Sequence, residues 1–210
     1  IHFSVSGSLY KMVKNILFSR PLYLVALEVE LPRVEFPNLN IQYTGVGKIN
    51  ASYSTTKNIQ RYKPTVIINF GSAGSLDKNI AGLVSVKDVV QRDMDVRKLG
   101  FKLGETPFEE IPDLIPLKTL TASSEQSKCK SVSCSTGDNF VTDFPELKSD
   151  IVDMELYAIA RVCFLENVPL IAWKYISDNA DGNSSSDWKK NVRSGTIAFK
   201  SQVIEWIKGK

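Results

Sequence analysis

Histidine is almost absent from this chain of 210 residues, because His2 is the only one. A catalytic Ser-His-Asp or Cys-His group therefore lacks its base within the body of the chain, and a metal site built on imidazole lacks its ligands. An enzyme of this composition needs carboxylates as its acid and base, helped at most by lysine, tyrosine or water. We expect no metal ion and no organic cofactor.

Cysteine is scarce as well. The three cysteines, Cys129, Cys134 and Cys163, include no pair with CxxC spacing. This odd, scattered set predicts reduced thiols in the cytoplasm and excludes a disulfide framework or a zinc site. Cys163 lies in an apolar pattern of helical period and is expected to pack in the core.

Long apolar runs and long basic runs are also missing. The longest apolar run, Leu22–Leu27, has the length of a strand and falls far below the ~20 residues that span a bilayer, so no membrane partner is expected. The formal net charge is only +3, without the basic patch of a protein that binds nucleic acid. The N-terminus lacks the continuous apolar stretch of a secretory signal, which favours a cytoplasmic location.

Length and composition favour one globular domain. Residues 1–20 are expected to form a tail, in which Met12 is a candidate natural start and residues 1–11 an extension. Residues 21–210 are long enough to bury a sizeable core and contain no internal repeat or low-complexity linker. The predicted organisation is a tail followed by a single domain.

Strand-like apolar runs alternate with stretches of helical period. The predicted strands are Leu22–Leu27, Asn40–Thr44, Thr65–Phe70, Val84–Val90, Ser131–Ser135 and Leu170–Ile176. The predicted helices end near Tyr62, cover Val152–Asn167, and run from about Asp187 to Ile207. This alternation predicts an α/β fold with a mixed or largely parallel sheet, whose ligands bind at the carboxyl ends of the strands.

The run Gly-Ser-Ala-Gly at residues 71–74 follows one predicted strand directly. It is either a tight turn or a segment whose backbone amides approach a ligand closely, because its side chains are small. It matches neither the phosphate-binding loop of nucleotide triphosphatases nor the glycine fingerprint of dinucleotide sites. Nucleoside triphosphates and dinucleotides are therefore not indicated.

Several carboxylates lie next to predicted element ends. Glu155 is near the start of a predicted helix, where it can cap the helix or accept hydrogen bonds from the two hydroxyls of a vicinal diol such as ribose. Asp178 follows a predicted strand and belongs either to a polar loop or to a buried site that raises its pKa and makes it a proton donor. Glu28 and Glu30 follow the first strand. They lie either at a solvent-exposed strand end or in a functional site.

The order of the short motifs is more informative than any one of them. They are Ala-Leu-Glu-Val-Glu, Gly-Val-Gly-Lys, Ile-Asn-Phe-Gly-Ser-Ala-Gly, Arg-Asp-Met-Asp-Val, Ser-Thr-Gly-Asp-Asn-Phe-Val, Asp-Met-Glu and Ile-Ser-Asp-Asn-Ala-Asp. In this order, over residues 22–209, the chain resembles the bacterial methylthioadenosine/S-adenosylhomocysteine nucleosidases of the nucleoside phosphorylase superfamily. The segment Val152–Asp181 is the most specific part of the resemblance.

The resemblance implies a three-layer α/β/α sandwich with a twisted mixed sheet, a homodimer, and cleavage of the bond between adenine and a 5′-substituted ribose. By motif position, Asp178 resembles the acid that protonates N7 of adenine, and Glu30 the glutamate that activates water. Glu155 resembles the acceptor of the ribose diol, and Met154 the residue that packs under the ribose. The remaining implied substrate contacts are Phe140, Val141, Ser72, Ala73, Gly74, Ser177 and, from a partner subunit over the 5′ group, Phe108.

Two departures bear on the reaction. Related purine nucleoside phosphorylases carry an arginine just before Gly-Ser, where this chain has Asn69-Phe70; this favours water over phosphate, although Lys174 and Arg92 leave phosphorolysis open. The segment Leu31–Pro37 replaces a helix and a hairpin of the usual family member. Loss of that helix affects the position of Glu30 more than that of any other predicted catalytic residue.

Other activities stay open on sequence alone. They are purine nucleoside phosphorolysis, hydrolysis of aminofutalosine, 5′-deoxyadenosine or AMP, and nucleoside binding without catalysis. AMP would need a cationic clamp for its phosphate, and none is evident near the motifs.

Overall fold

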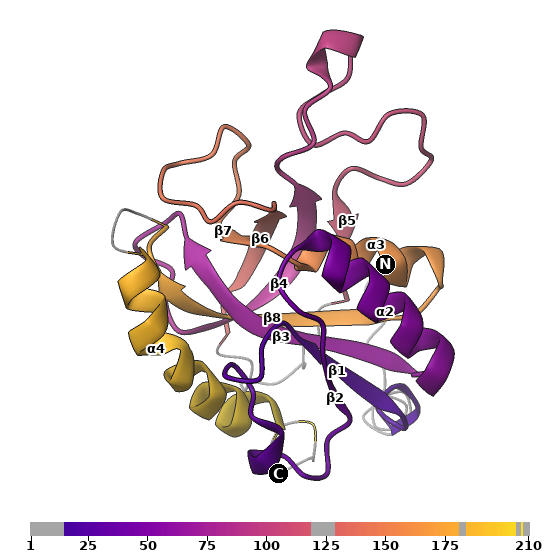
Figure 1. Ribbon diagram of the computed structural model, residues 1–210, viewed down its shortest axis with the longest axis vertical. Helices are drawn as coiled ribbons and strands as arrows, with labels where there is room; N and C mark the ends of the chain where they lie inside the picture. The colour runs from indigo at the N-terminus through magenta and orange to yellow at the C-terminus, as the bar shows by residue number, and fades with distance from the viewer. Residues whose placement is uncertain (1–14, 119–128, 181–183, 205–206, 208–210) are drawn as a thin grey trace, which may run out of the picture.

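The computed structural model describes residues 15–118, 129–180, 184–204 and 207 (Figure 1). The described strands form one eight-stranded sheet. They are β1 (Pro21–Val25), β2 (Ile41–Tyr43), β3 (Val66–Ser75), β4 (Leu83–Gln91), β5 (Ile115–Pro116), β6 (Ser131–Thr136), β7 (Ile151–Asp153) and β8 (Leu170–Asp178). The strand core is apolar and rich in β-branched residues, as in Val-Ile-Ile at the start of β3, which suits a sheet buried on both faces.

The sheet is mixed. Strand β3 runs parallel to β1 and β8 and antiparallel to β7, while β4 runs parallel to β6 and antiparallel to β8 and β5. The pairings from β3 to β8, β4, β6, β7 and back to β3 close a ring. The rim of this ring brings together chain segments that are far apart in sequence.

Helices cover both faces of the sheet (Figure 1). Helices α2 (Lys48–Tyr62) and α3 (Leu156–Leu165) pack against each other, over a large apolar cluster that includes Cys163. Helix α4 (Ser184–Phe199) and the π-helical turn η3 (Lys200–Ile204) contribute to a second cluster with β1, β3 and β8. The three-layer α/β/α fold implied by the resemblance is confirmed, and so is the packing of Cys163 in the core.

Three predicted boundaries were wrong, and all three concern the edge of the sheet where site residues lie. Residues 71–74 continue β3 instead of forming a turn, because this strand pairs with β8 throughout, with an irregularity at Ala73/Gly74. Ser177 and Asp178 correspondingly belong to β8 and not to a loop. The predicted start of the helix at Val152 is instead β7, since a three-residue apolar run has no period that separates strand from helix.

Two connecting segments complete the description. The short 3₁₀ turn Arg33–Glu35 lies between β1 and β2, and the side chains of Leu31 and Phe36 on either side of it are buried in the second cluster. The segment between β4 and β5 extends away from the body of the molecule (Figure 1) and contains the 3₁₀ turn Arg97–Leu99.

Residues 15–20 lead into β1. Leu17 and Phe18 pack against the second apolar cluster, and the Thr65 hydroxyl donates a hydrogen bond to the Leu17 carbonyl at 2.8 Å. Residues 1–14, which include the candidate start at Met12, lie outside the described part of the chain. Among the described helices, none combines the length and the apolar character needed to cross a bilayer.

Candidate active site

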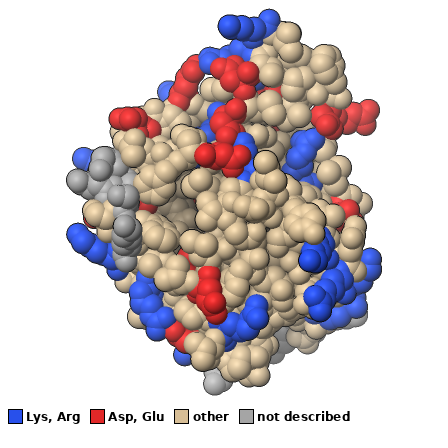
Figure 2. Space-filling view, in the orientation of Figure 1, with Lys and Arg blue, Asp and Glu red and all other residues tan. Residues whose placement is uncertain are grey.

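A cavity of about 250 Å³ lies at the rim of the strand ring, and a hollow is visible on the face shown in Figure 2. Strands β3, β7 and β8, the residues after β1, β4 and β6, and helix α4 all contribute to its lining. The predicted site residues that line it are Glu30, Ser72, Ala73, Gly74, Phe140, Val141, Met154, Glu155, Ser177 and Asp178. The structure thus brings together all the predicted site residues except Phe108.

Glu30 is held firmly although the segment after it is short. The carboxylate is only 4% exposed. Its Oε1 accepts hydrogen bonds from the Ser72 amide at 2.8 Å and the Ser72 hydroxyl at 2.7 Å, and its Oε2 accepts one from the Leu27 amide at 3.0 Å. These three donors fix the position of the carboxyl group beside the cavity.

Asp178 ends β8 and is 8% exposed. Its Oδ2 accepts a hydrogen bond from the Ser177 hydroxyl at 2.8 Å, and its Oδ1 accepts one from the Ala180 amide at 2.9 Å. A Cβ atom at Gly74 would lie 2.9 Å from Oδ1, closer than real Cβ atoms come to other heavy atoms. Gly74 is therefore needed so that the Asp178 carboxyl group can pack against β3, next to the cavity.

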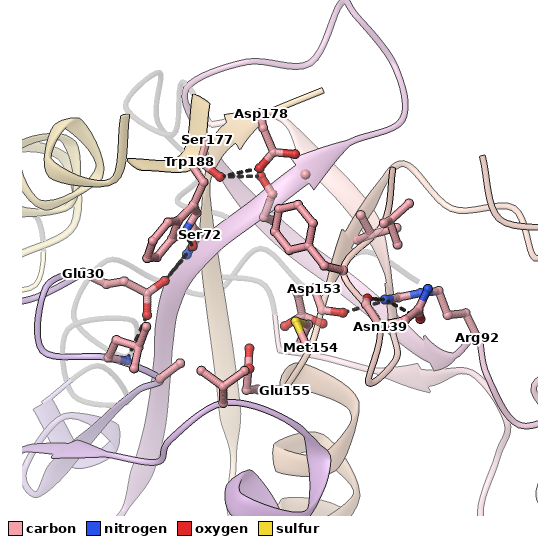
Figure 3. Close-up of a pocket in the computed structure, with 18 residues that line it drawn as sticks. Glu30, Ser72, Arg92, Asn139, Asp153, Met154, Glu155, Ser177, Asp178 and Trp188 are labelled. Atoms are coloured by element: carbon pink, nitrogen blue, oxygen red, sulfur yellow. Dashed lines mark hydrogen bonds between the residues drawn. The ribbon is translucent and has the colours of Figure 1, made fainter. Parts of the chain in front are cut away.

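Glu155 immediately precedes α3, and its side chain makes no capping hydrogen bond to that helix. Its Oε1 instead accepts a hydrogen bond from the amide of Gly47 at 2.9 Å. Burial, reinforced by the negative charge of Asp153, raises the pKa of Glu155 to about 7. The capping interpretation is thus replaced by a carboxyl group that faces the cavity and titrates near neutral pH (Figure 3).

A buried ion pair lies beside these carboxyl groups. Lys174 Nζ is 2.8 Å from Asp153 Oδ2, and both side chains are almost fully buried. Burial works to raise the pKa of Asp153, but the Lys174 ammonium, together with hydrogen bonds from the Thr136 hydroxyl and the Leu156 amide, holds this pKa below its ordinary value. Burial works to lower the pKa of Lys174, but Asp153 and Glu155 raise it above its ordinary value. Both groups of the pair are therefore charged.

Arg92, just after β4, connects three segments of the cavity wall (Figure 3). Its guanidinium donates hydrogen bonds to the carbonyls of Ser135 at 2.7 Å, Asp153 at 2.8 Å, Gly137 at 3.2 Å and Asn139 at 2.7 Å. Arg92 is 6% exposed. It therefore fixes the loop that carries the next two residues of the chain, Phe140 and Val141, into the cavity.

Apolar side chains line the same cavity. Met154 lies next to Glu155, and Phe140 and Val141 come from the loop that Arg92 holds. Phe140 is 48% exposed and Val141 is 8% exposed. A flat, hydrophobic ligand group such as a purine can stack on an aromatic side chain in this position.

Phe108 does not reach the cavity. It lies in the extended segment between β4 and β5, is 92% exposed and has a φ of 61°, and its ring contacts Phe101 at a centroid distance of 5.3 Å. A contact between Phe108 and the site of another subunit stays a prediction.

Sequence reasoning assigned no role to Trp188 and Asp153, and it considered Lys174 only as a possible ligand of phosphate. A signal for Lys174 was present, because a lysine in the apolar run Leu170–Ile176 must be paired if the strand is buried. The only signal for Asp153 was its place in the Asp-Met-Glu motif, directly before Met154 and Glu155. Trp188 gave no signal, because its role depends on how α4 lies against β3.

No group of three or more potential metal ligands occurs in the described part of the chain. The polar side chains that line the cavity include the carboxyl groups of Glu30, Glu155 and Asp178 and the hydroxyl groups of Ser72 and Ser177. This donor set suits recognition of a sugar, proton transfer and activation of water.

Comparisons with known proteins agree with the fold and identify the family. A sequence model of the phosphorylase superfamily matches residues 28–205. The 5′-methylthioadenosine/S-adenosylhomocysteine nucleosidase of Staphylococcus saprophyticus is 35% identical over 179 residues, which cover 77% of this chain and 77% of the relative. The corresponding protein of Staphylococcus aureus is 31% identical over 182 residues, covering 79% of this chain and 78% of the relative.

A solved structure supports the fold independently. The 5′-methylthioadenosine/S-adenosylhomocysteine nucleosidase of Helicobacter pylori, complexed with a pyrrolopyrimidine-bearing compound, superimposes with a TM-score of 0.75 and 23% identity, over 88% of this chain and 97% of the other. At this identity the likeness speaks for the fold alone, whereas the sequence matches speak for the family. The chain belongs to the phosphorylase superfamily and, within it, to the family of methylthioadenosine/S-adenosylhomocysteine nucleosidases.

Proposed function

We propose that this protein hydrolyses the N-glycosidic bond of 5′-methylthioadenosine and S-adenosylhomocysteine, and releases adenine and a 5-thio-substituted ribose. The proposal is supported by family membership and by three carboxyl groups that reach one cavity from different elements (Figure 3). Cleavage of this bond develops positive charge on the ribose and negative charge on the departing base. Separate carboxyl groups can serve the two ends of the breaking bond.

Each carboxyl group has its own task in this mechanism. Asp178 donates a proton to N7 of adenine, and the Ser177 hydroxyl and Ala180 amide hold its two oxygens in place. Glu155 in its ionised form accepts hydrogen bonds from the 2′- and 3′-hydroxyls of ribose, while Met154 packs beneath the sugar. Phe140 stacks on the adenine. These contacts hold the nucleoside in place between the proton donor and the base.

Glu30 activates the attacking water. Its carboxyl group is fixed by Ser72 and Leu27, and in this mechanism it takes a proton from water while that water attacks the anomeric carbon. In its ionised form the same group stabilises the positive charge that develops on the sugar. Ser72 lines the cavity beside this base and orients it through its amide and hydroxyl groups.

The observation that favours water over phosphate is the state of the buried cations. Lys174 is paired with Asp153, and the Arg92 guanidinium donates to backbone carbonyls. Asn69, where related phosphorylases carry an arginine, donates its amide to the Leu24 carbonyl at 3.0 Å. A phosphate ion that bound to Ser72 would lie next to the Glu30 carboxylate, which already accepts hydrogen bonds from Ser72. The two negative charges would repel each other.

The finer assignments belong to the same proposal. The protein acts in the cytoplasm, in methionine salvage, and forms a homodimer in which Phe108 reaches over the 5′ group in the partner subunit's site. The exposure of Phe108 supports this arrangement.

The deciding experiment is adenine release from 5′-methylthioadenosine, with and without phosphate, and with identification of the sugar product. Release without phosphate and free methylthioribose support the proposal, whereas strict dependence on phosphate and a ribose 1-phosphate product would make the enzyme a phosphorylase. Aminofutalosine, 5′-deoxyadenosine and AMP are compared in parallel. Asp178→Asn is the control, because it should nearly abolish release while the nucleoside still binds.

A further inference from the structure

Trp188 enters the cavity from α4 (Ser184–Phe199) and makes one directional contact there (Figure 3). Its indole Nε1 lies 2.8 Å from the Ser72 hydroxyl oxygen. The indole N–H can only donate, so Ser72 is the acceptor in this contact. The Ser72 hydrogen is thereby left to point at Glu30 Oε1, 2.7 Å away.

The indole therefore fixes the rotation of the Ser72 hydroxyl group. A serine hydroxyl turns freely unless its partners define its hydrogen. Here Trp188 occupies a lone pair of the oxygen on one side, and Glu30 accepts the hydrogen on the other. The amide of Ser72 also donates to Glu30 Oε1, at 2.8 Å, so both donors of one residue hold the same carboxylate oxygen.

Helix α4 reaches Glu30 by a second, separate path. The Thr196 hydroxyl is fully buried and donates to the Glu30 carbonyl at 2.8 Å. Thr196 lies eight residues after Trp188, so both side chains project from the same face of the helix. The Asn191 side chain, also on this face, donates to the Ser177 carbonyl at 2.9 Å.

The helix is packed closely at this point. A Cβ atom at Gly195 would lie 3.0 Å from the Tyr175 side chain on β8. The glycine thus allows α4 to approach the sheet closely enough for the indole N–H to meet Ser72. The position of Trp188 is set by the docking of the whole helix.

We propose that Trp188 is a positioning residue for Glu30 and acts through the Ser72 hydroxyl. The proposal rests on the proposed function, in which Glu30 activates water. With the indole present, Glu30 Oε1 accepts both hydrogen bonds from Ser72, and Oε2, which accepts one from the Leu27 amide, keeps one acceptor position for water. Without the indole N–H, the Ser72 hydroxyl can rotate away, and the Glu30 carboxylate gains freedom just where the water must be held.

The test uses Trp188→Phe, which keeps an aromatic wall and removes only the donor. Loss of one hydrogen bond at a reacting group predicts a roughly three- to tenfold lower kcat. KM should change by less than about twofold, because binding contacts shared by the ground state and the transition state remain. Trp173→Phe is the matched control, since Trp173 lies in the core against Phe199, with ring centroids 6.3 Å apart.

A double-mutant cycle with Ser72→Ala tests whether the effect passes through Ser72. In the Ser72→Ala background, Trp188→Phe should cause no further loss of kcat, because the hydroxyl it orients is gone. Equal losses in both backgrounds would overturn the proposal, as would an effect confined to KM or one matched by Trp173→Phe.

A spectroscopic measurement does not depend on turnover. In a ¹H–¹⁵N spectrum, the indole signal that disappears in Trp188→Phe should shift and exchange faster with solvent in Ser72→Ala. An unchanged signal would also overturn the proposal. If the unaltered protein releases no adenine, the proposed function fails, whereas an active enzyme that is indifferent to Trp188→Phe refutes only the positioning role.

Discussion

Recognition of ribose should weaken as the pH falls below neutrality, because of Glu155. Its pKa is raised to about 7, and only the ionised carboxylate can accept hydrogen bonds from both hydroxyls of the diol. At pH 8 most Glu155 is ionised, whereas at pH 6 only about a tenth is. KM for 5′-methylthioadenosine should therefore rise by up to roughly tenfold from pH 8 to pH 6.

The same raised pKa predicts an opposite effect on folding. A carboxyl group whose pKa rises on folding stabilises the native state when it is protonated, and this contribution is lost as the pH rises through the folded pKa. Raising the pKa of Glu155 from 4.5 to about 7 corresponds to roughly 3 kcal/mol between pH 4 and pH 8. The residue thus favours binding at the pH where it destabilises the fold.

Glu155→Gln separates these effects. At pH 8 the variant should have a higher melting temperature than the unaltered protein, because an amide has no charge to desolvate. It should have a higher KM, and that KM should no longer vary between pH 6 and pH 8. Glu166→Gln, at an exposed position just after α3, is the matched control and should leave both profiles unchanged. A KM that is flat with pH in the unaltered protein, or a Gln variant that keeps the pH dependence, would refute the reasoning.

Three further substitutions test the wall of the cavity. Gly74→Ala places a methyl group 2.9 Å from Asp178 Oδ1, and it should lower kcat at least tenfold by displacing the acid; a kinetic assay that finds normal kcat would contradict the packing. Lys174→Met leaves Asp153 buried without its partner and should cost about 3–5 kcal/mol in the free energy of unfolding, measured with urea. Arg92→Lys keeps a charge but cannot span the same carbonyls, and we expect a several-fold higher KM with a smaller change in kcat; equal losses in both would argue against a role limited to the loop.

The residues that the sequence predicted well lie in short motifs at the ends of strands. Ser72, Glu155 and Asp178 each follow or end an apolar run, so the sheet itself brings them to one rim. The boundaries of these strands were predicted less well. Whether a strand stops at a glycine or continues through it depends on the partner strand, and the pairing of β3 with β8 extends as far as Gly74 and Asp178.

The predicted position of Glu30 depended most on the shortened segment that follows it. The structure explains why the shortening leaves the residue in the cavity. Leu31 is fully buried and Phe36 is 5% exposed in the cluster beneath, so the short segment keeps an apolar anchor. The Leu27 amide and Ser72 then fix the carboxylate from both sides, and none of these contacts requires the missing helix.

Trp188 shows what lies beyond sequence reasoning here. It is separated by 116 positions from the serine that it contacts, and the contact depends on where α4 docks. The sequence around Trp188 does not predict where the helix packs. An aromatic residue near the start of a helix is more often part of the core. Only the pairing of helix and strand converts it into a candidate for the site.

The choice between water and phosphate depends on cationic side chains. The sequence shows that they are present but does not show which groups they pair with. Lys174 and Arg92 are both present in the sequence and both close to the motifs, so each could have bound phosphate. In the structure, Lys174 neutralises Asp153, and both terminal nitrogens of Arg92 donate to backbone carbonyls. Releasing either cation to bind phosphate would leave buried acceptors unpaired, which costs more than a new contact returns. The cavity is therefore better suited to a neutral nucleophile, for which the proposed function makes Glu30 the base.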